Sequence, residues 1–347
     1  MLAKLSSHAG TTLLLLAAII IGSVMGSFAP ERGAALSAWT DPVILVLVSL
    51  LFFEVRFEAI ARAAGHWRFL ALAWVANFVL IPVIGYGIAS LFLSGQPLLF
   101  TGLFIYFIAP CTDWFLGFTR MARGNVGLGS VLLPLNLISQ LLLYPVYLGL
   151  FTAHAVHGAG TDMGSLFASL WQWFLLPFAG AVVAHQGLRL VLPAAMFERL
   201  LRLVGALVPV VIAALIVCIF AGNIGTILEN PKAFGFILAA VFIFFVCTWF
   251  LGELLARRAR LAYPEHALLT MTTAARNAPL MLGVTAAALP DQPLLYAALI
   301  IGMLVEFPHL TALRHLLLRR APQPPDEPLA PAATAAPPAV VQPLPAI

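Results

Sequence analysis

Two charged residues lie inside long apolar runs of the sequence, each next to a proline that interrupts a helix. In "FIYFIAPCTDWFLGF", Pro110 is followed by Cys111, and Asp113 comes two residues later. In "TTAARNAPLM", Arg276 and Asn277 stand just before a proline. A charged side chain at the centre of a membrane helix costs about 3 kcal/mol on insertion scales, so such residues usually mark a substrate or ion pathway. A broken helix also exposes main-chain amides and carbonyls that only a protein-lined site can satisfy.

These residues leave structural and functional interpretations open. If the two interrupted segments meet, Asp113 and Arg276 either neutralise each other as a structural lock or face a substrate or a coupled proton. Cys111 directly follows the proline, so its thiol is either a small buried apolar group or a soft ligand that binds a metal or metalloid reversibly. Cys218 and Cys247 lie in plain apolar runs and are interpreted as core residues.

Three further polar residues lie inside apolar runs. Glu306, in "GMLVEFPHL", is either a proton carrier or a hydrogen-bonded structural carboxylate. Asn136 and Asn277 either satisfy the interrupted helices or contact the substrate. His154 and His157 are interpreted as solvated loop residues, because two ligands alone make a poor metal site.

The composition indicates that the chain is embedded in a lipid bilayer. Hydrophobic residues make up 62% of the 347 residues and charged residues only 9%, against about a quarter charged in soluble domains. A membrane-spanning helix needs about 20 mostly apolar residues. Ten such segments are predicted, at residues 11–28, 42–60, 69–93, 98–119, 126–151, 165–186, 203–222, 233–255, 266–289 and 293–315.

The basic residues predict the orientation of these spans. Lys and Arg collect in the cytoplasmic loops of membrane proteins. With the N-terminus inside and ten spans, 15 of the 18 Lys and Arg residues fall in the inner segments. Both termini are therefore predicted to be cytoplasmic, in a multi-pass protein of the cell membrane.

Ten spans divide into two halves of five, at about residues 11–152 and 165–318. An odd number per half gives the halves opposite orientations, as in the inverted repeats of secondary transporters. The interruptions fall in the fourth and ninth spans, which are corresponding positions, and such paired interruptions indicate a binding site. The predicted fold is therefore all-α, with a transporter domain over residues 1–318. Residues 319–347, rich in Pro and Ala, are predicted to form a disordered cytoplasmic tail.

No sequence pattern supports an enzyme. GxSxG, HExxH, Walker and CxxC patterns in a suitable context are not found, and no cofactor is expected. The net charge of +4 does not indicate nucleic acid, since the basic residues lie in short loops. The expected partners are the lipid bilayer and a small-molecule or metalloid substrate, and the oligomeric state stays open.

Several short motifs, taken in order, resemble those of the bile acid:sodium symporter superfamily and, within it, of the arsenical-resistance permeases. They are "APCT" at 109–112, "ARGNV" at 122–126, Asn136, "TTAARN" at 272–277 and "LVEFP" at 304–308. The resemblance covers about residues 10–318. It implies a panel domain and a core domain, with the interrupted helices of spans four and nine crossing in the core near the bilayer centre.

The resemblance also implies roles for individual residues. In arsenite permeases the cysteine after the proline of span four is the expected arsenite ligand, and this role carries over to Cys111, with Thr112 beside it. The glutamate of span ten carries over to Glu306. Those permeases export arsenite or antimonite against protons, so an antiporter is expected.

Three departures from the resemblance concern charge. Arsenite permeases tend to have a small or apolar residue at the position of Asp113 and an amide at that of Arg276. The sodium-coupled branch holds its ions with acid, amide and hydroxyl oxygens; here Thr272 stands in place of its ninth-span acid, and Arg276 in place of its glutamine. Its fourth-span amide is also lost, with Leu116 near that place. The residues expected to form the region of a coupling ion are Asp113, Thr272, Thr273 and Glu306.

Arg276 argues against sodium coupling. A guanidinium stays protonated, and at about 4 Å it repels a sodium ion by about 4 kcal/mol at an effective dielectric constant near 20. Such repulsion weakens binding about a thousandfold. We therefore expect Arg276 to take the place of the coupled cation.

The leading hypothesis is a secondary transporter that exports arsenite or antimonite by alternating access, coupled to protons and not to sodium. Cys111 binds the metalloid, Asp113 or Glu306 exchanges a proton, and Arg276 organises the crossing. The alternative is a carrier of small organic anions, in which Arg276 holds a carboxylate or sulfonate. A third class is a membrane protein without transport activity. The residues expected to bind substrate are Cys111, Thr112, Asp113, Asn136, Arg276, Asn277 and Glu306.

Overall fold

The computed structural model describes residues 8–54, 65–112, 114–151, 176–229, 231–289 and 292–322. Over these residues the regular structure is helical, apart from one isolated bridge. Helices suit a bilayer because they satisfy the main-chain polar groups within each segment, which lipid cannot do. Asp113, the predicted loop histidines at 154 and 157, and nearly all of the predicted tail lie outside the described residues.

The helices follow the predicted apolar segments closely. Proline stands in the first turn of α7, α15, α16 and α17, where its missing N–H would have no partner within the helix. The bounds are α2 (His8–Phe28), α3 (Pro30–Ser37), α4 (Thr40–Phe53), α5 (Trp67–Val75), η2 (Ala76–Leu80), α6 (Ile81–Leu93), α7 (Pro97–Ile108), α8 (Phe115–Met121), α9 (Val126–Phe151), α12 (Leu176–Val191), α13 (Ala194–Leu228), α14 (Pro231–Arg258), α15 (Tyr263–Ala274), α16 (Ala278–Ala288) and α17 (Pro293–Leu318).

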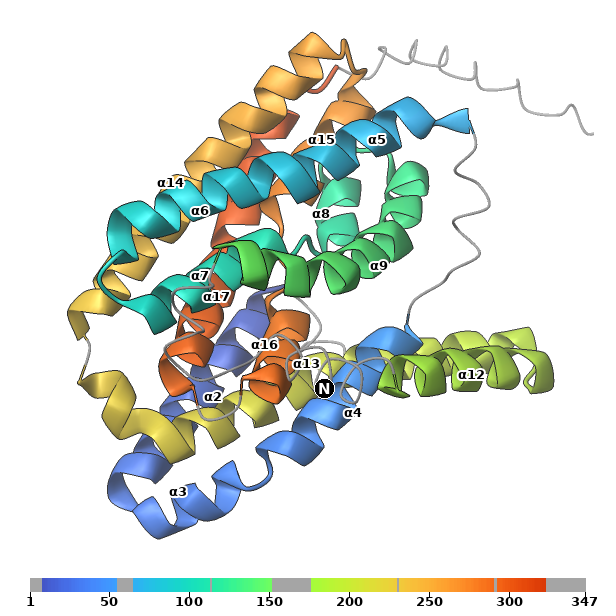
Figure 1. Ribbon diagram of the computed structural model, residues 1–347. Helices are drawn as coiled ribbons and strands as arrows, with labels where there is room; N and C mark the ends of the chain where they lie inside the picture. The colour runs from blue at the N-terminus through green and yellow to red at the C-terminus, as the bar shows by residue number, and fades with distance from the viewer. Residues whose placement is uncertain are drawn as a thin grey trace, which may run out of the picture.

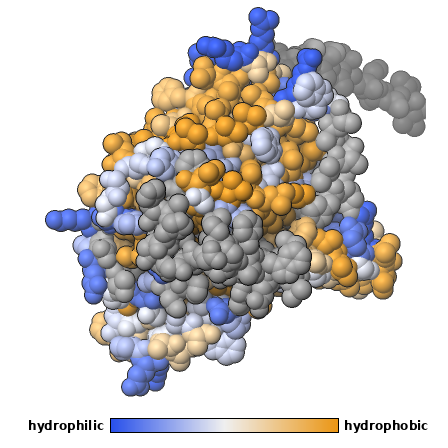
Figure 2. All heavy atoms as spheres, in the orientation of Figure 1, coloured by the Kyte–Doolittle hydropathy of each residue, from blue (hydrophilic) through white to orange (hydrophobic). Residues whose placement is uncertain are grey.

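Five of the described helices are long and apolar enough to cross a membrane, or six if the bent pair α3 and α4 forms one span. The segments predicted to be interrupted appear as pairs of shorter helices, which individually fall below that length. Figure 2 shows apolar residues over much of the described surface, with hydrophilic residues gathered toward the top and lower edges of the view. The protein is therefore a multi-pass membrane protein, and the arrangement as ten spans in inverted repeats stays a prediction.

Figure 1 shows the helices in two groups. In the lower group α13 contacts α2, α3 and α4, and α12 contacts α4. The upper group contains α5 to α9, α14 and α15, and α17 contacts both α7 of this group and α13 of the other. A glycine permits close packing in the lower group, since a Cβ at Gly22 would lie 2.8 Å from the carbonyl oxygen of Val217.

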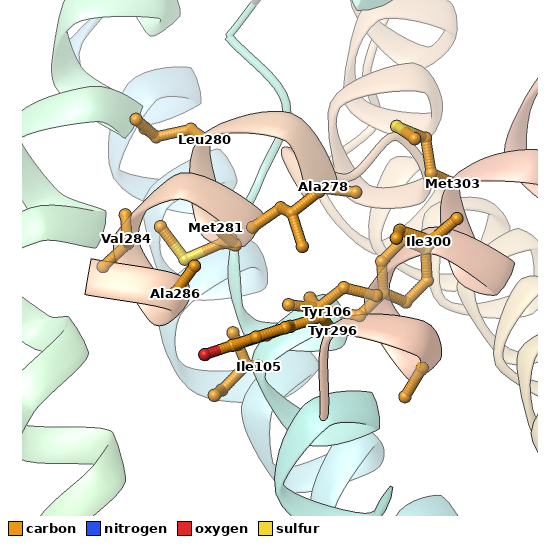
Figure 3. Packing of buried hydrophobic residues seen from close by; sticks show 14 of the residues in the cluster. Ile105, Tyr106, Ala278, Leu280, Met281, Val284, Ala286, Tyr296, Ile300 and Met303 are labelled. Carbon is orange, nitrogen blue, oxygen red and sulfur yellow. The ribbon is translucent and has the colours of Figure 1, made fainter. Parts of the chain in front are cut away.

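Apolar packing between α7, α16 and α17 supports the region next to the helix breaks (Figure 3). Ile105 and Tyr106 of α7 lie among side chains that include Met281 of α16 and Ile300 of α17, and all four are buried. The ring of Tyr106 packs directly on Gly302, where a Cβ would lie 2.9 Å from the ring carbons. Because this contact leaves no room for a larger residue, it fixes the distance between α7 and α17.

Three local features were not expected from the sequence. The short helix α3 lies between the first two predicted spans, and the π-helical segment η2 interrupts the third. Helix α13 begins well before the predicted start at residue 203 and includes the charged residues Glu198, Arg199 and Arg202. A helix can continue from lipid into water without a change of backbone geometry, so hydropathy alone does not mark its end.

Candidate functional site

Both interrupted helices are broken where the sequence predicts. The first break lies between α7 and α8, and the second between α15 and α16. Pro110 disfavours the helical conformation of the residue before it, and Ala109 is accordingly extended, with φ −103° and ψ 104°. Ala275 is also extended, with φ −75° and ψ 135°. Four half-helices therefore end or begin at two short extended stretches.

The two extended stretches pair with each other as an isolated antiparallel bridge. The amide of Cys111 donates to the carbonyl of Ala275 at 3.0 Å, and the amide of Asn277 donates to the carbonyl of Ala109 at 2.8 Å. These bonds satisfy main-chain groups that lipid would leave unpaired. The two breaks therefore form one unit, which we call the helix crossing: residues 109–112 together with residues 275–277.

Arg276 is completely buried at the helix crossing, with 0% of its surface exposed. Its Nη1 donates to the carbonyl of Phe107 at 2.9 Å, and its Nη2 donates to the carbonyls of Thr272 at 3.0 Å and Thr273 at 2.7 Å. These carbonyls belong to the C-terminal turns of α7 and α15, where the helix dipoles concentrate partial negative charge. The guanidinium also lies over the ring of Phe244, 5.7 Å from its centroid. A fixed positive charge thus occupies the place where two helix C-termini converge.

Two asparagines contact the hydroxyl of Thr272, and one of them also lies next to the guanidinium. Nη2 of Arg276 lies 3.4 Å from Oδ1 of Asn77. Asn77 and Asn136 each donate from Nδ2 to the hydroxyl of Thr272, at 3.2 and 3.3 Å. Asn77 lies in η2, and single π-helical turns occur frequently at functional sites. Asn77 was not predicted from the sequence, although it is a lone amide in the apolar run "LAWVANFVLI".

Glu306 of α17 connects the two breaks. It is fully buried, and its Oε1 accepts hydrogen bonds from Nε1 of Trp114 at 2.8 Å and from the main-chain amide of Arg276 at 2.9 Å. Its Oε2 accepts a longer bond, of 3.5 Å, from the hydroxyl of Tyr106. The carboxyl group of Glu306 therefore forms hydrogen bonds with three segments: α7, the segment before α8 and the break before α16. Neither Trp114 nor Tyr106 was expected from the sequence.

The other predicted residues also lie at the helix crossing. Cys111 is buried (0% exposed), and its amide donates to the carbonyl of Ala275. The hydroxyl of Thr112, a half-buried residue, accepts a hydrogen bond from Nδ2 of Asn277 at 2.9 Å. Oδ1 of Asn277 in turn accepts from a main-chain amide in the first turn of α16 and caps that helix. The structure therefore gives Asn277 a structural role and leaves its contact with substrate a prediction.

Thr273 contributes its carbonyl and not its hydroxyl. The hydroxyl donates to the carbonyl of Leu269, one turn earlier in α15, at 2.9 Å. The predicted ion pair between Asp113 and Arg276 involves a residue outside those described, so it stays a prediction. Among the described residues, main-chain carbonyls accept hydrogen bonds from the Arg276 guanidinium and stabilise its positive charge.

Comparison with known proteins gives one family and several relatives. Residues 42–230 match the model of the family described as "Sodium Bile acid symporter family". Arsenical-resistance protein Acr3 of Corynebacterium glutamicum is 23% identical over 331 residues, covering 88% of each chain. Putative symporter YfeH of Escherichia coli is 30% identical over 161 residues, which are 45% of this chain and 47% of that protein. The uncharacterized protein YbaS of Bacillus subtilis is 26% identical over 120 residues, 34% of this chain and 39% of its own.

Proposed function

The chain belongs to the sodium bile acid symporter family, and we propose that it moves its substrate past the helix crossing by alternating access. The family consists of transporters and not of enzymes, and this chain is a secondary transporter. We propose that its ten apolar segments form two inverted repeats of five. The panel domain would comprise α2, α3, α4, α12 and α13, and the core domain the remaining helices. The two groups of helices in Figure 1 and the antiparallel pairing of the two breaks support this assignment.

The observation that carries the proposal is the position of the Arg276 guanidinium. Half-helix C-termini and unwound carbonyls are the groups that coordinate sodium in transporters with inverted repeats. Here such carbonyls, on Phe107, Thr272 and Thr273, accept hydrogen bonds from Arg276. A sodium ion about 4 Å from this charge would be repelled by about 4 kcal/mol. We therefore assign the place of the coupled cation to Arg276 and expect transport without sodium.

The proposed substrate is arsenite or antimonite, exported from the cell. Its support is the soft sulfur of Cys111 at the helix crossing, together with the similarity to a protein named for arsenical resistance. In the binding step the thiol replaces one hydroxyl of As(OH)₃. An S–As bond forms, an As–O bond breaks, and the thiol proton leaves with the hydroxyl as water. A single such bond is readily reversed, which suits transport better than storage.

Coupling to protons is assigned to Glu306 or Asp113. Glu306 accepts hydrogen bonds from Trp114 and from the main-chain amide of Arg276, so a change in its charge alters bonds at both breaks. Asp113 enters this proposal from the sequence alone. Proton uptake at either carboxylate would then bias the position of the core domain against the panel domain.

A carrier of small organic anions is the second candidate. One observation favours it: Nε of Arg276 is buried without a hydrogen-bond partner among the described residues, which leaves one donor for a carboxylate. The Nη donors, however, point to main-chain carbonyls, and the whole side chain is buried. Proteoliposomes loaded with arsenite or with a bile acid such as taurocholate separate the two candidates.

The test of the proposed function is arsenite accumulation in cells that lack other arsenite exporters, at two external pH values. Cells with the parent protein should accumulate less arsenite, and Cys111→Ser should abolish this protection while the protein remains in the membrane. Cys218→Ser is the matched control, since Cys218 is also buried (5% exposed) but lies in α13. Equal protection by Cys111→Ser and Cys218→Ser would contradict the role of the thiol.

A further inference from the structure

A second cluster of charged residues lies far along the helices from the crossing. It forms where the C-terminal end of α14, the N-terminal end of α15 and the C-terminal end of α17 meet, at the top of Figure 1. A pocket of about 520 Å³ lies between these helix ends. Its polar lining consists of Glu253, Arg257, Arg260, His266 and Arg320. We call it the basic pocket.

Glu253 organises the basic pocket but does not neutralise it. Glu253 is only 7% exposed. Its carboxylate forms ion pairs with Arg320 and with Arg257, at 3.5 Å from the latter, and lies 3.1 Å from Nε2 of His266. Arg260 forms no ion pair with any residue in the part of the chain that the structure describes. Three arginines against one glutamate leave a net charge of +2 even when His266 is neutral.

The backbone holds Arg260 in a conformation that usually requires glycine. Its φ is 52°, in the left-handed region, directly after α14. The amide of Leu261 donates to the carbonyl of Ala256 at 3.0 Å, which is the bond that closes a helix end with a left-handed residue. An arginine costs about 1 kcal/mol more than glycine here. Its guanidinium lines the basic pocket, and among the described residues it forms no ion pair with an acidic side chain.

Two features of the basic pocket indicate a position near the membrane–water interface. It sits at the ends of three helices, and Arg320 lies over the ring of Trp249, 5.1 Å from its centroid. Tryptophan is enriched at membrane–water interfaces. The distribution of basic residues predicts that this end is cytoplasmic, and anionic phospholipids face that side.

We propose that the basic pocket binds the phosphate group of an anionic phospholipid or of a soluble phosphate compound. Glu253 holds Arg257 and Arg320 in place, and Arg260 supplies an unpaired guanidinium. A guanidinium matches the oxygens of a phosphate with two parallel hydrogen bonds. This site is independent of the proposed substrate and of the helix crossing.

The test is thermal unfolding of the purified full chain in detergent, with added dioctanoyl phosphatidylglycerol, dioctanoyl phosphatidylcholine or inorganic phosphate. Phosphatidylglycerol should raise the unfolding midpoint of the parent, whereas the net-neutral phosphatidylcholine should not. Arg260→Gln should weaken the response about fivefold, as expected for one basic residue near a membrane surface. Arg258→Gln is the matched control, because it removes the same charge from a residue that does not line the pocket.

A second variant separates binding from folding. Arg260→Gly should be at least as stable as the parent, because glycine adopts a φ of 52° without strain, yet it should weaken the response to the same extent as Arg260→Gln. An Arg260-dependent shift with inorganic phosphate alone supports the site and assigns it to a soluble phosphate compound. The proposal is overturned if both lipids act equally, if neither phosphatidylglycerol nor phosphate acts, or if Arg258→Gln weakens the response as much as Arg260→Gln.

Discussion

The chain holds arginines in two opposite environments. At the helix crossing, Arg276 is 0% exposed and donates to main-chain carbonyls at 2.7–3.0 Å. In the basic pocket, the side chains of Arg257 and Arg320 are 75% and 46% exposed and share one carboxylate. Water and salt screen the ion pairs of Arg257 and Arg320, and an exposed ion pair contributes about 0–1 kcal/mol to stability. Breaking the contacts of a buried charge costs about 3–5 kcal/mol.

The contrast shows what each charge is suited for. In the basic pocket, exposed guanidinium groups can exchange one partner for another at small cost, as a site for a mobile anion requires. In the proposed function, the covalently attached guanidinium of Arg276 takes the place of a cation that would otherwise bind at the helix crossing and leave it. If the positive charge of Arg276 cannot leave, the ion that drives transport must bind at another group. The buried carboxyl group of Glu306, which accepts a hydrogen bond from the main-chain amide of Arg276, is our candidate for that group.

The largest effect is expected from Arg276→Met, which removes the guanidinium but keeps an unbranched apolar side chain. The carbonyls of Phe107, Thr272 and Thr273 then lose their donors, and each unsatisfied buried group costs about 1–3 kcal/mol. We expect transport in proteoliposomes to become undetectable and the thermal unfolding midpoint to fall. A variant that unfolds like the parent would show that the half-helix ends do not depend on the guanidinium.

Glu306→Gln should have the next largest effect. The amide oxygen of glutamine still accepts from Trp114 and from the main chain of Arg276, but the side chain cannot exchange a proton. We expect a stable protein that exports arsenite more slowly than the parent and without a response to a pH gradient. Glu306→Ala is the control that also loses the hydrogen bonds and hence stability. If Glu306→Gln keeps pH-driven export, the proton is carried elsewhere, and Asp113 becomes the candidate.

Thr272→Val tests the asparagine contacts and should have a smaller effect. It removes the hydroxyl that accepts from Asn77 and Asn136. A hydrogen bond between membrane helices contributes about 0.6 kcal/mol on average, so two should contribute about 1 kcal/mol to the free energy of unfolding. Thr273→Val is the matched control, because that hydroxyl donates within α15. Denaturant unfolding should show a larger loss in the free energy of unfolding for Thr272→Val than for Thr273→Val. Equal losses would show that the hydrogen bonds from the two asparagines do not contribute to stability.

The smallest effect is expected from Arg320→Gln at the basic pocket. Without added anionic lipid, the free energy of unfolding should change by about 0.5 kcal/mol or less, and the change should shrink as salt is added. The loss from Arg276→Met should not depend on salt, because the Arg276 side chain is completely buried. Unfolding at low and high salt measures the losses from both variants. A similar salt dependence of the two losses would show that the arginines of the basic pocket and of the helix crossing do not differ in their exposure to solvent.

Local sequence signals were sufficient to predict the positions of the two helix breaks. Pro110 and the charged Arg276 each interrupt an apolar run, and their pairing follows from the corresponding positions of the two runs. The contacts of Arg276 were not predictable in the same way. Every residue carries a carbonyl group, so Phe107 has no feature in the sequence that marks it as a ligand.

Other features depend on contacts between distant parts of the chain. Asn77 reaches the helix crossing through η2, and an isolated amide does not predict a π-helical turn. The basic pocket combines three helices, so the spacing of Glu253, His266 and Arg320 along the sequence carries no pattern. From the sequence, the arginines at 257, 258 and 260 were interpreted as a signal of orientation, with contact to a lipid headgroup left as an open alternative, and their pairing with Glu253 was not predicted.

The most direct test of the central claim compares the sodium dependence of the parent with that of Arg276→Gln. Glutamine is the residue that the resemblance implies at this position in the sodium-coupled branch. We predict that the parent exports arsenite at equal rates with sodium or choline in the external medium. We also predict that sodium raises the thermal unfolding midpoint of Arg276→Gln but not that of the parent. A parent protein whose transport requires a sodium gradient would contradict the account.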